Sequence, residues 1–335
     1  MGSERRLKVA IVQHAPVFLN LRESIQKARC LVEEASREGA ELIVFPETWL
    51  PGYPVWLDAA PGAALWDHPP ARALYRLLAA NAVEIPGAEL EALLDMAREA
   101  GAYLVIGAHE RDGGTLYNSL IMVDRDGCRC TVHRKLMPTY TERLVWGRGD
   151  GSTLTALETD HGTLGGLICW EHWMPLARAA MHAKREVVHV AQWPWVKELH
   201  HIASRHYAFE GQCFVLAAGS VLSKGEILAG YRSLGVESDA LDILQAIPGE
   251  SDLWVMRGGS AVIGPDAGYV AGPVYDEACI VYADVDLDAV VEGHLTMDSD
   301  GHYARPDVFR LEVNDRPQRR VVFSSDRSGT GGQQP

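Results

Sequence analysis

The chain has 335 residues, of which 47% are hydrophobic and 23% are charged, and this composition excludes a disordered protein. Its 45 acidic and 31 basic residues leave a formal charge of −14, which argues against binding to nucleic-acid phosphates or to anionic membrane surfaces. The six cysteines form no Cys-x-x-Cys pair, and no apolar run is long enough to span a bilayer. We therefore expect a cytoplasmic protein with reduced thiols and with neither nucleic-acid nor membrane partners.

Apolar runs of strand length alternate with helical patterns in the first third of the chain. The runs predict strands at residues 7–12, 42–45 and 103–106, and the helical spacing predicts helices over residues 21–35 and 88–100. Asn20 with Glu23 is a capping pattern for the first helix, and Gly39 and Gly101 are typical helix stops. Because the strands are apolar throughout, we expect sheets that helices cover.

The rest of the chain is richer in strands. Residues 117–123 and 130–133 flank an Asp-Gly turn and predict a hairpin. Further strands are expected at residues 164–169, 187–190, 214–218, 260–263 and 280–285, with a helix over residues 175–183. No linker composition interrupts the pattern before about residue 310, so we expect one domain over residues 1–310 and a C-terminal arm over residues 311–335 whose Gly-rich end is loose.

Cys169 ends one of these predicted strands and leads into a helix. Such a residue lies at the carboxyl edge of a sheet, where α/β enzymes place their sites. Unpaired N–H groups at the coming helix can lower a thiol pKa or bind an oxyanion. Gly165 and Gly166 just upstream permit close backbone packing. On position alone, a small buried hydrophobe is an equally good interpretation of this cysteine.

Two charged residues follow other predicted strands. Glu47 is flanked by aromatic residues, and the resulting desolvation would raise its pKa towards that of a general base, although a capping or ion-paired carboxylate is the commoner case. Lys135, taken alone, is most simply a solvated charge. Glu142 could orient this lysine or pair with Arg143.

Motifs for other chemistries are missing from the sequence. The 13 histidines form no His-Glu-x-x-His, and there is neither a Walker loop nor a Gly-x-Gly-x-x-Gly after a strand. Gly-x-Ser-x-Gly, the signature of many serine hydrolases, is also absent. We therefore expect no metal and no cofactor.

A glutamate, a lysine and a cysteine at three strand ends resemble the carbon–nitrogen hydrolase (nitrilase) superfamily over about residues 7–310. Five segments carry the resemblance in order: LIVFPET (42–48), HRKLMPT (133–139), YTERLVWG (140–147) with GDG (149–151), GLICWEH (166–172) and DSDGHYARPDVF (298–309). Cys169-Trp-Glu-His with Pro175 is similar to the true nitrilase branch, whereas amidases and carbamoylases more often carry Cys-Tyr-Asp.

This resemblance implies an α/β fold, a four-layer α-β-β-α sandwich, in homodimers that build larger homo-oligomers. It implies that Cys169 is the nucleophile, Glu47 the general base, Lys135 the cation that stabilises charge in the transition state, and Glu142 a supporting glutamate. The implied reaction takes a small-molecule nitrile and water to a carboxylic acid and ammonia through a thioimidate and an acyl-thioester, with an amide as a minor product.

Several of the nine tryptophans lie near the matching segments. They indicate either an aromatic pocket, suited to aromatic or arylaliphatic nitriles, or rings that fill the core or an interface. Tyr53, Trp170 and Trp193 are the candidates for contacts with the substrate or its charged intermediate. The alternatives are an amidase or N-carbamoyl amide hydrolase with the same three residues, a hydratase that releases the amide, and a catalytically silent scaffold.

Overall fold

The strands form two seven-stranded sheets. A computed structural model describes residues 5–318 and residue 321. The first sheet has the order β14 (Cys279–Asp286), β1 (Arg6–Gln13), β2 (Leu42–Val44), β4 (Tyr103–Asp112), β5 (Thr115–Val123) and β6 (Cys130–Arg134), and β3 (Val83–Glu84) pairs with β4. The second has the order β11 (Val221–Ser223), β12 (Trp254–Ile263), β10 (Phe214–Ala218), β9 (Glu186–Gln192), β8 (Gly162–Ile168) and β7 (Leu157–Thr159), and β13 (Tyr269–Tyr275) pairs with β12.

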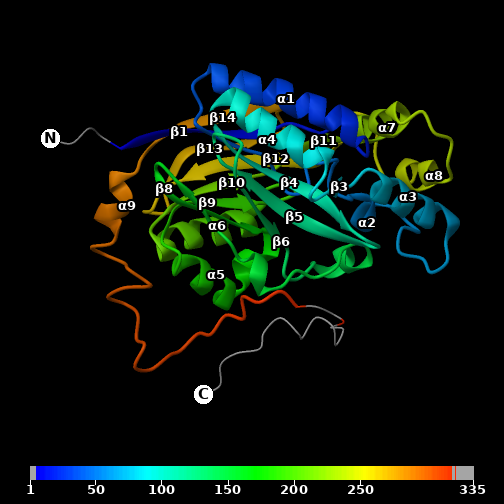
Figure 1. Cartoon of the computed structure of the whole chain (residues 1–335). Coiled ribbons are helices and arrows are strands. Elements are labelled where there is room, and N and C mark those ends of the chain that lie inside the picture. Colours follow the sequence, from blue (N-terminus) through cyan, green and yellow to red (C-terminus); the bar gives the residue numbers. More distant parts are fainter. Residues whose placement is uncertain (1–4, 319–320, 322–335) are drawn as a thin grey trace.

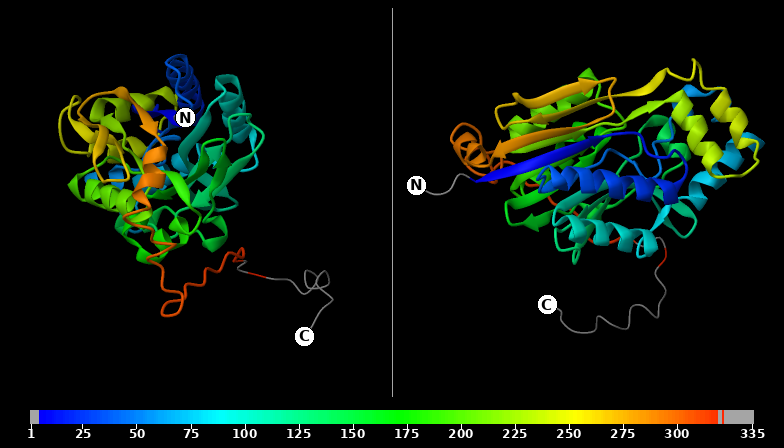
Figure 2. Two further views of the ribbon diagram at one scale, coloured as in Figure 1. Left: turned by 90° about the vertical axis from the view of Figure 1, so that its left-hand side faces the viewer. Right: turned by 90° about the horizontal axis from the view of Figure 1, so that it is seen from above.

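Alternation along the strands gives each sheet two apolar faces. In β1, Val9 and Ile11 belong to the core between the sheets, whereas Ala10 and Val12 pack beneath helices. These helices are α1 (Leu21–Arg37) and α4 (Ala88–Ala100), and α5 (Pro175–His182) and α6 (Glu198–Gly211) cover the second sheet. Figures 1 and 2 show the two helix pairs on opposite sides of the strands. The predicted α/β four-layer α-β-β-α sandwich is confirmed.

Local signals in the sequence place the helix ends well. The Asn20 side chain accepts the N–H of Glu23 at 3.2 Å, and this bond fixes the start of α1. Gly101 adopts a left-handed φ of 62° and ends α4. Both ends lie where the capping pattern and the glycine predict them.

Other elements were not predicted from the sequence. A lobe at one end of the sandwich contains α2 (Trp56–Ala59), α3 (Pro69–Ala80), α7 (Lys224–Ser233) and α8 (Ala240–Gln245), which share one apolar cluster (Figure 1). α6 and α9 (Asp288–Gly293) were missed as well. The strand expected at residues 103–106 continues to Asp112 and forms a hairpin with β5 through a Gly113-Gly114 turn.

After α9 the chain runs to Gln318 without helix or strand (Figure 1). It passes the short 3₁₀ helix η2 (Gly151–Thr153), where the N–H of Gln318 donates to Asp150 at 2.8 Å. The expected domain boundary near residue 310 stays a prediction, and the expected loose end of the arm lies outside the described residues. Among residues 5–318, no helix is both long and apolar enough to cross a bilayer.

Gly165→Ala tests the close packing just upstream of Cys169. A Cβ at this position would overlap the carboxylate of buried Glu186, which pairs with His189 at 2.8 Å. We expect the free energy of unfolding to fall by about 1–3 kcal/mol or more, because the overlap displaces a buried carboxylate from its hydrogen-bond partners. The control is Gly114→Ala, where nothing lies within 4 Å of the new methyl group. Equal urea midpoints for the two variants would contradict this account.

Candidate active site

Cys169 sits at a sharp turn between β8 and the 3₁₀ helix η3 (Cys169–Trp173). Its φ is 54°, in the left-handed region that disfavours side chains other than glycine, so surrounding contacts must hold it there. One contact is a hydrogen bond from Nδ1 of His172 to the Cys169 carbonyl oxygen at 2.7 Å. The side chain is only 3% exposed. The turn therefore presents the thiol at the sheet edge, as the sequence predicts.

Glu47 and Lys135 come from the other sheet. Glu47 lies just beyond β2, and its N–H donates across to the carbonyl of Trp193 at 3.3 Å. Lys135 directly follows β6, and its N–H donates to the Asn118 carbonyl on β5 at 2.8 Å. The two sheets thus bring three strand ends together from distant parts of the chain.

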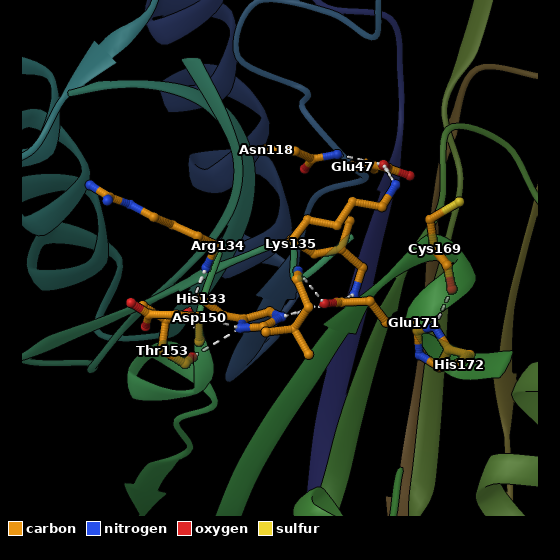
Figure 3. A network of polar contacts seen from close by, with 12 residues as sticks. Glu47, Asn118, His133, Arg134, Lys135, Asp150, Thr153, Cys169, Glu171 and His172 are labelled. Carbon is orange, nitrogen blue, oxygen red and sulfur yellow. Dashed lines mark hydrogen bonds and ion pairs between the residues drawn. The ribbon is translucent and has the colours of Figure 1, made fainter. Parts of the chain in front are cut away.

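The side chains of these residues form a buried cluster of charges (Figure 3). Lys135 Nζ lies 2.9 Å from Glu47 Oε1 and 2.7 Å from Glu142 Oε2. Asn118 donates to Glu47 Oε1 at 2.6 Å, and the Tyr53 hydroxyl donates to Glu142 Oε1 at 2.9 Å. The charged groups therefore have fixed positions.

One oxygen in this cluster has no partner. Glu47 Oε2 is buried without a hydrogen bond, which is costly for a carboxylate unless a reacting group uses it. The Cys169 sulfur and an oxygen from each of Glu47 and Glu142 lie within 4.8 Å of one another, and Figure 3 shows the sulfur facing Glu47. Among the described residues, these three could also ligate a cation, and Lys135 supplies their positive charge.

Burial sets the protonation states of the cluster. It raises the pKa of Glu47 to about 7, against the lowering effect of Lys135. Burial, together with Glu47, also raises the pKa of the Cys169 thiol well above its usual value, although Lys135 and the Trp170 N–H act in the opposite direction. The Trp170 N–H thus lowers this pKa, as a helix N–H group was expected to do, but burial and Glu47 outweigh it. Burial would lower the pKa of Lys135, but the carboxylates of Glu47 and Glu142 act in the opposite direction and the pKa is raised well above its usual value, so the lysine stays charged.

A cavity of about 600 Å³ opens onto the thiol. Cys169, Glu142, Tyr53 and Trp170 line it, and the indole of Trp170 is 44% exposed. Other lining residues come from η1 (Tyr140–Leu144), from the start of α6 and from β12, and they include Tyr140, Trp195, Lys197, His200 and Met256. The cavity is large enough for a small organic molecule, and Tyr53, Tyr140, Trp170 and Trp195 give its wall an aromatic part.

Trp193, expected at the substrate pocket, does not line this cavity. Its side chain is fully buried, stacks on His200 with ring centroids 4.2 Å apart, and donates to Ser204 at 3.2 Å. The chain bends at Pro194 and Trp195 after β9 ends, so the strand alternation that would place both rings on one face is broken, and Trp195 rather than Trp193 lines the cavity. The Trp193 side chain therefore does not reach the cavity at which it was expected, whereas Trp195 lines it.

Sequence reasoning missed two polar residues that hold the cluster. Asn118 on β5 donates to Glu47, and its only signal in the sequence is an amide in a mainly apolar strand. His172 lies within the GLICWEH segment but had no assigned part. Its Nε2 is 3.0 Å from Nε2 of His189, which in turn contacts Glu186, so a buried polar chain leads away from the turn at Cys169.

Comparison with known proteins agrees with this geometry. Residues 8–294 match the family described as carbon–nitrogen hydrolase. The chain therefore belongs to the carbon–nitrogen hydrolase family and is a hydrolase, as the five segments implied. A similar fold occurs in the solved structure of the C. elegans NitFhit protein, with a TM-score of 0.66 and 18% identity over 96% of this chain and 70% of that chain.

Relatives within the family carry nitrilase names. The chain is 40% identical to a protein named aliphatic nitrilase from Sinorhizobium fredii (strain HH103), over 95% of this chain and 98% of that protein. It is 36% identical to a protein of Oryza sativa subsp. japonica named bifunctional nitrilase/nitrile hydratase, over 95% of this chain and 87% of that protein. The predicted membership in the nitrilase family is confirmed.

Lys135→Met tests the charge balance of the cluster. It leaves two buried carboxylates without a counter-ion, which should cost about 3–5 kcal/mol of unfolding free energy. Removing the ammonium raises the pKa of Glu47 further above its ordinary 4.5. A raised carboxyl pKa destabilises the fold only above the unfolded-state pKa, so the loss should be small near pH 4.5 and grow as the pH rises.

Urea denaturation of this variant at about pH 5 and about pH 8 measures the effect. Exposed Lys184, replaced by Met, is the control and should show little change at either pH. An equal loss of stability at both pH values for Lys135→Met would contradict the charge argument.

Proposed function

We propose that this chain hydrolyses organic nitriles to the carboxylic acid and ammonia. The observation that carries the proposal is a thiol facing an unpartnered carboxylate oxygen of Glu47, with the ammonium of Lys135 beside both. The nitrilase names of the relatives support the choice of nitrile over amide. A catalytically silent scaffold would not need the buried charges, which are costly to maintain.

The first half of the reaction forms a covalent intermediate. Glu47 Oε2 takes the thiol proton as the sulfur attacks the nitrile carbon, because the raised pKa of Cys169 keeps the free thiol protonated. One π bond of the C≡N group breaks, and its electron pair goes to nitrogen, where Lys135 or the N–H of Trp170 stabilises the charge. The proton held by Glu47 passes to that nitrogen, and the product is a thioimidate.

The second half consumes two waters. Glu47 removes a proton from the first water, which adds to the thioimidate carbon, and ammonia then leaves with the proton to give an acyl-thioester. A second water, activated in the same way, releases the acid and restores the thiol. A base with a pKa of about 7 can accept and return the proton in each step near neutral pH.

An amide is the minor product that this scheme allows. The tetrahedral species formed by the first water can expel the thiol instead of ammonia, and then the amide is released. A relative named as both nitrilase and nitrile hydratase makes this branch worth measuring. An amidase or carbamoylase activity with the same residues is the alternative that product analysis tests.

The cavity supports a preference for aromatic or arylaliphatic nitriles. Trp170, Trp195 and Tyr140 line it, and flat rings stack well on such walls. We propose no cofactor, since the cluster contains a nucleophile, a base and a cation of its own.

We further propose that copies of the chain associate through the outer helices of the second sheet. Leu199, Ile202 and Phe209 form an exposed apolar stripe at helical spacing on α6, and Leu176 on α5 is also exposed. A homodimer built on this face could extend into larger homo-oligomers. All six cysteines are free, which suits the reducing cytoplasm that we propose as the compartment.

Product analysis tests the proposed function. An arylaliphatic nitrile, a short aliphatic nitrile and the amides matching both should be incubated with the protein, with acid, amide and ammonia measured. We expect acid and ammonia from nitriles, faster with the arylaliphatic one, and little turnover of added amide. Cys169→Ala should lose several orders of magnitude in rate with the fold intact. Turnover of amides alone, or activity in Cys169→Ala, would disprove the scheme.

The pH profile tests the base. Because Glu47 must be ionised to accept the thiol proton, kcat/KM should rise with pH and inflect near 7. Glu47→Gln should be almost inactive at every pH, since an amide cannot take that proton. A flat profile between about pH 5 and about pH 9 in the native protein would assign the proton to another group.

A further inference from the structure

Glu171, two residues after Cys169, connects the two sheets with one side chain. Its Oε2 accepts the N–H of Ile168 at 2.7 Å, and its Oε1 accepts the N–H of Leu136 at 2.7 Å. Ile168 directly precedes Cys169, and Leu136 directly follows Lys135. One carboxylate therefore binds the backbone next to the thiol and the backbone next to the ammonium group (Figure 3).

His133 completes this arrangement. Its Nε2 lies 3.1 and 2.9 Å from the two oxygens of Glu171, and its Nδ1 lies 2.9 Å from the carbonyl oxygen of Thr153. Since a carbonyl oxygen only accepts, Nδ1 carries a hydrogen, and the carboxylate that already accepts two N–H groups takes a third from Nε2. The ring is then an imidazolium, paired with Glu171 where neither side chain is exposed by more than 1%.

The protonation states agree with this geometry. Burial would lower the pKa of His133, but the charge and hydrogen bond of Glu171 outweigh it and raise the pKa above its usual value. Burial would raise the pKa of Glu171, but His133 and the N–H groups of Leu136 and Ile168 outweigh it and lower the pKa. The pair is therefore ionic.

We propose that Glu171 is a positioning residue that sets the spacing between Lys135 and Cys169. A helix cap would need only the bond to Ile168, whereas the bond to Leu136 and the pair with His133 reach across to β6 in the other sheet. The charged pair Lys135–Glu47 belongs to the first sheet and the thiol to the second, so their separation depends on links of this kind. The inference rests on the proposed parts of Cys169 and Lys135.

Glu171→Gln is the informative change, because an amide has one acceptor oxygen where the carboxylate has two. Either the Ile168 or the Leu136 N–H then loses its partner, and one reactive group shifts relative to the other. We expect kcat for a nitrile to fall about 10²-fold with a small change in KM, since displacements of about 1 Å have effects of this size. The rate at which iodoacetamide alkylates Cys169, measured without nitrile, should fall in parallel.

Glu110→Gln is the matched control. Glu110 is also a buried carboxylate, and it does not line the cavity. It accepts a hydrogen bond from Ser119 at 2.7 Å and pairs with Arg134, which lies next to His133 on β6. This variant should lose stability but keep kcat and the alkylation rate. Native kcat and alkylation in folded Glu171→Gln, or equal losses in both variants, would overturn the proposal.

If the native protein turned over neither nitrile nor amide, the proposed function would fail, while the alkylation comparison would still decide the part of Glu171.

A second pair of variants decides the question if Glu171→Gln does not fold. His133→Gln retains a side-chain N–H donor towards Glu171, whereas His133→Phe removes that donor and leaves the carboxylate with only the N–H groups of Ile168 and Leu136. The alkylation rate of Cys169 should stay within a few-fold of native in the first and fall in the second. Equal rates in the two variants would overturn the proposal.

Discussion

The ammonium group of Lys135 lies between the carboxylates of Glu47 and Glu142, and none of the three side chains is exposed by more than 3%. Removing three charges from water is unfavourable unless hydrogen bonds replace the lost hydration. Tyr53 and the backbone N–H of Thr139 donate to Glu142 for this reason. Asn118 donates to one oxygen of Glu47, and the other oxygen stays free. Every other property of the site follows from this arrangement.

One consequence concerns the nucleophile. A thiol next to two carboxylates in a buried site is held in its protonated form, even with an ammonium group nearby. In the proposed reaction, the sulfur therefore becomes a strong nucleophile only when a base removes its proton during attack. Glu47, with a pKa of about 7, fits that task because it is ionised in much of the population at neutral pH.

Much of this architecture can be predicted from the sequence, and the parts that cannot be predicted have physical reasons. The strands before Glu47 and Cys169 are short apolar runs, and the strand before Lys135 follows an Asp-Gly turn of a hairpin, so the ends of these strands are visible without coordinates. α1 has an Asn20 cap, α4 ends at a left-handed Gly101, and both have amphipathic spacing. In contrast, α6 carries histidines and other polar residues on faces that tertiary contacts bury, and so has a weak helical pattern.

The cavity wall was harder to predict than the charge cluster. Trp193 and Trp195 are the same residue type two positions apart, and only the direction of the chain after β9 decides which ring meets the cavity. Asn118 is an ordinary strand amide until the fold brings Glu47 to it. The sequence shows the helix N–H groups that lower the pKa of the thiol, but not the burial and the two carboxylates that outweigh them.

The residues of the site come from two sheets packed face to face, so the distance between the sheets sets the distances between these residues. Glu47 and Lys135 extend from the first sheet and Cys169 from the second. Polar bonds cross between the sheets near the cluster: Gln192 donates to the Phe45 carbonyl at 2.8 Å, and Glu47 donates its N–H to Trp193. Apolar packing alone is non-directional and tolerates small slides, whereas hydrogen bonds between fixed backbone groups do not. Close contact at Gly166, where a Cβ would lie 2.8 Å from Leu120 Cδ1, brings the layers near enough for those bonds to form. The small residues before Cys169 and the hydrogen bonds around it therefore act together to hold the sulfur of Cys169 close to the carboxylate of Glu47 and the ammonium group of Lys135.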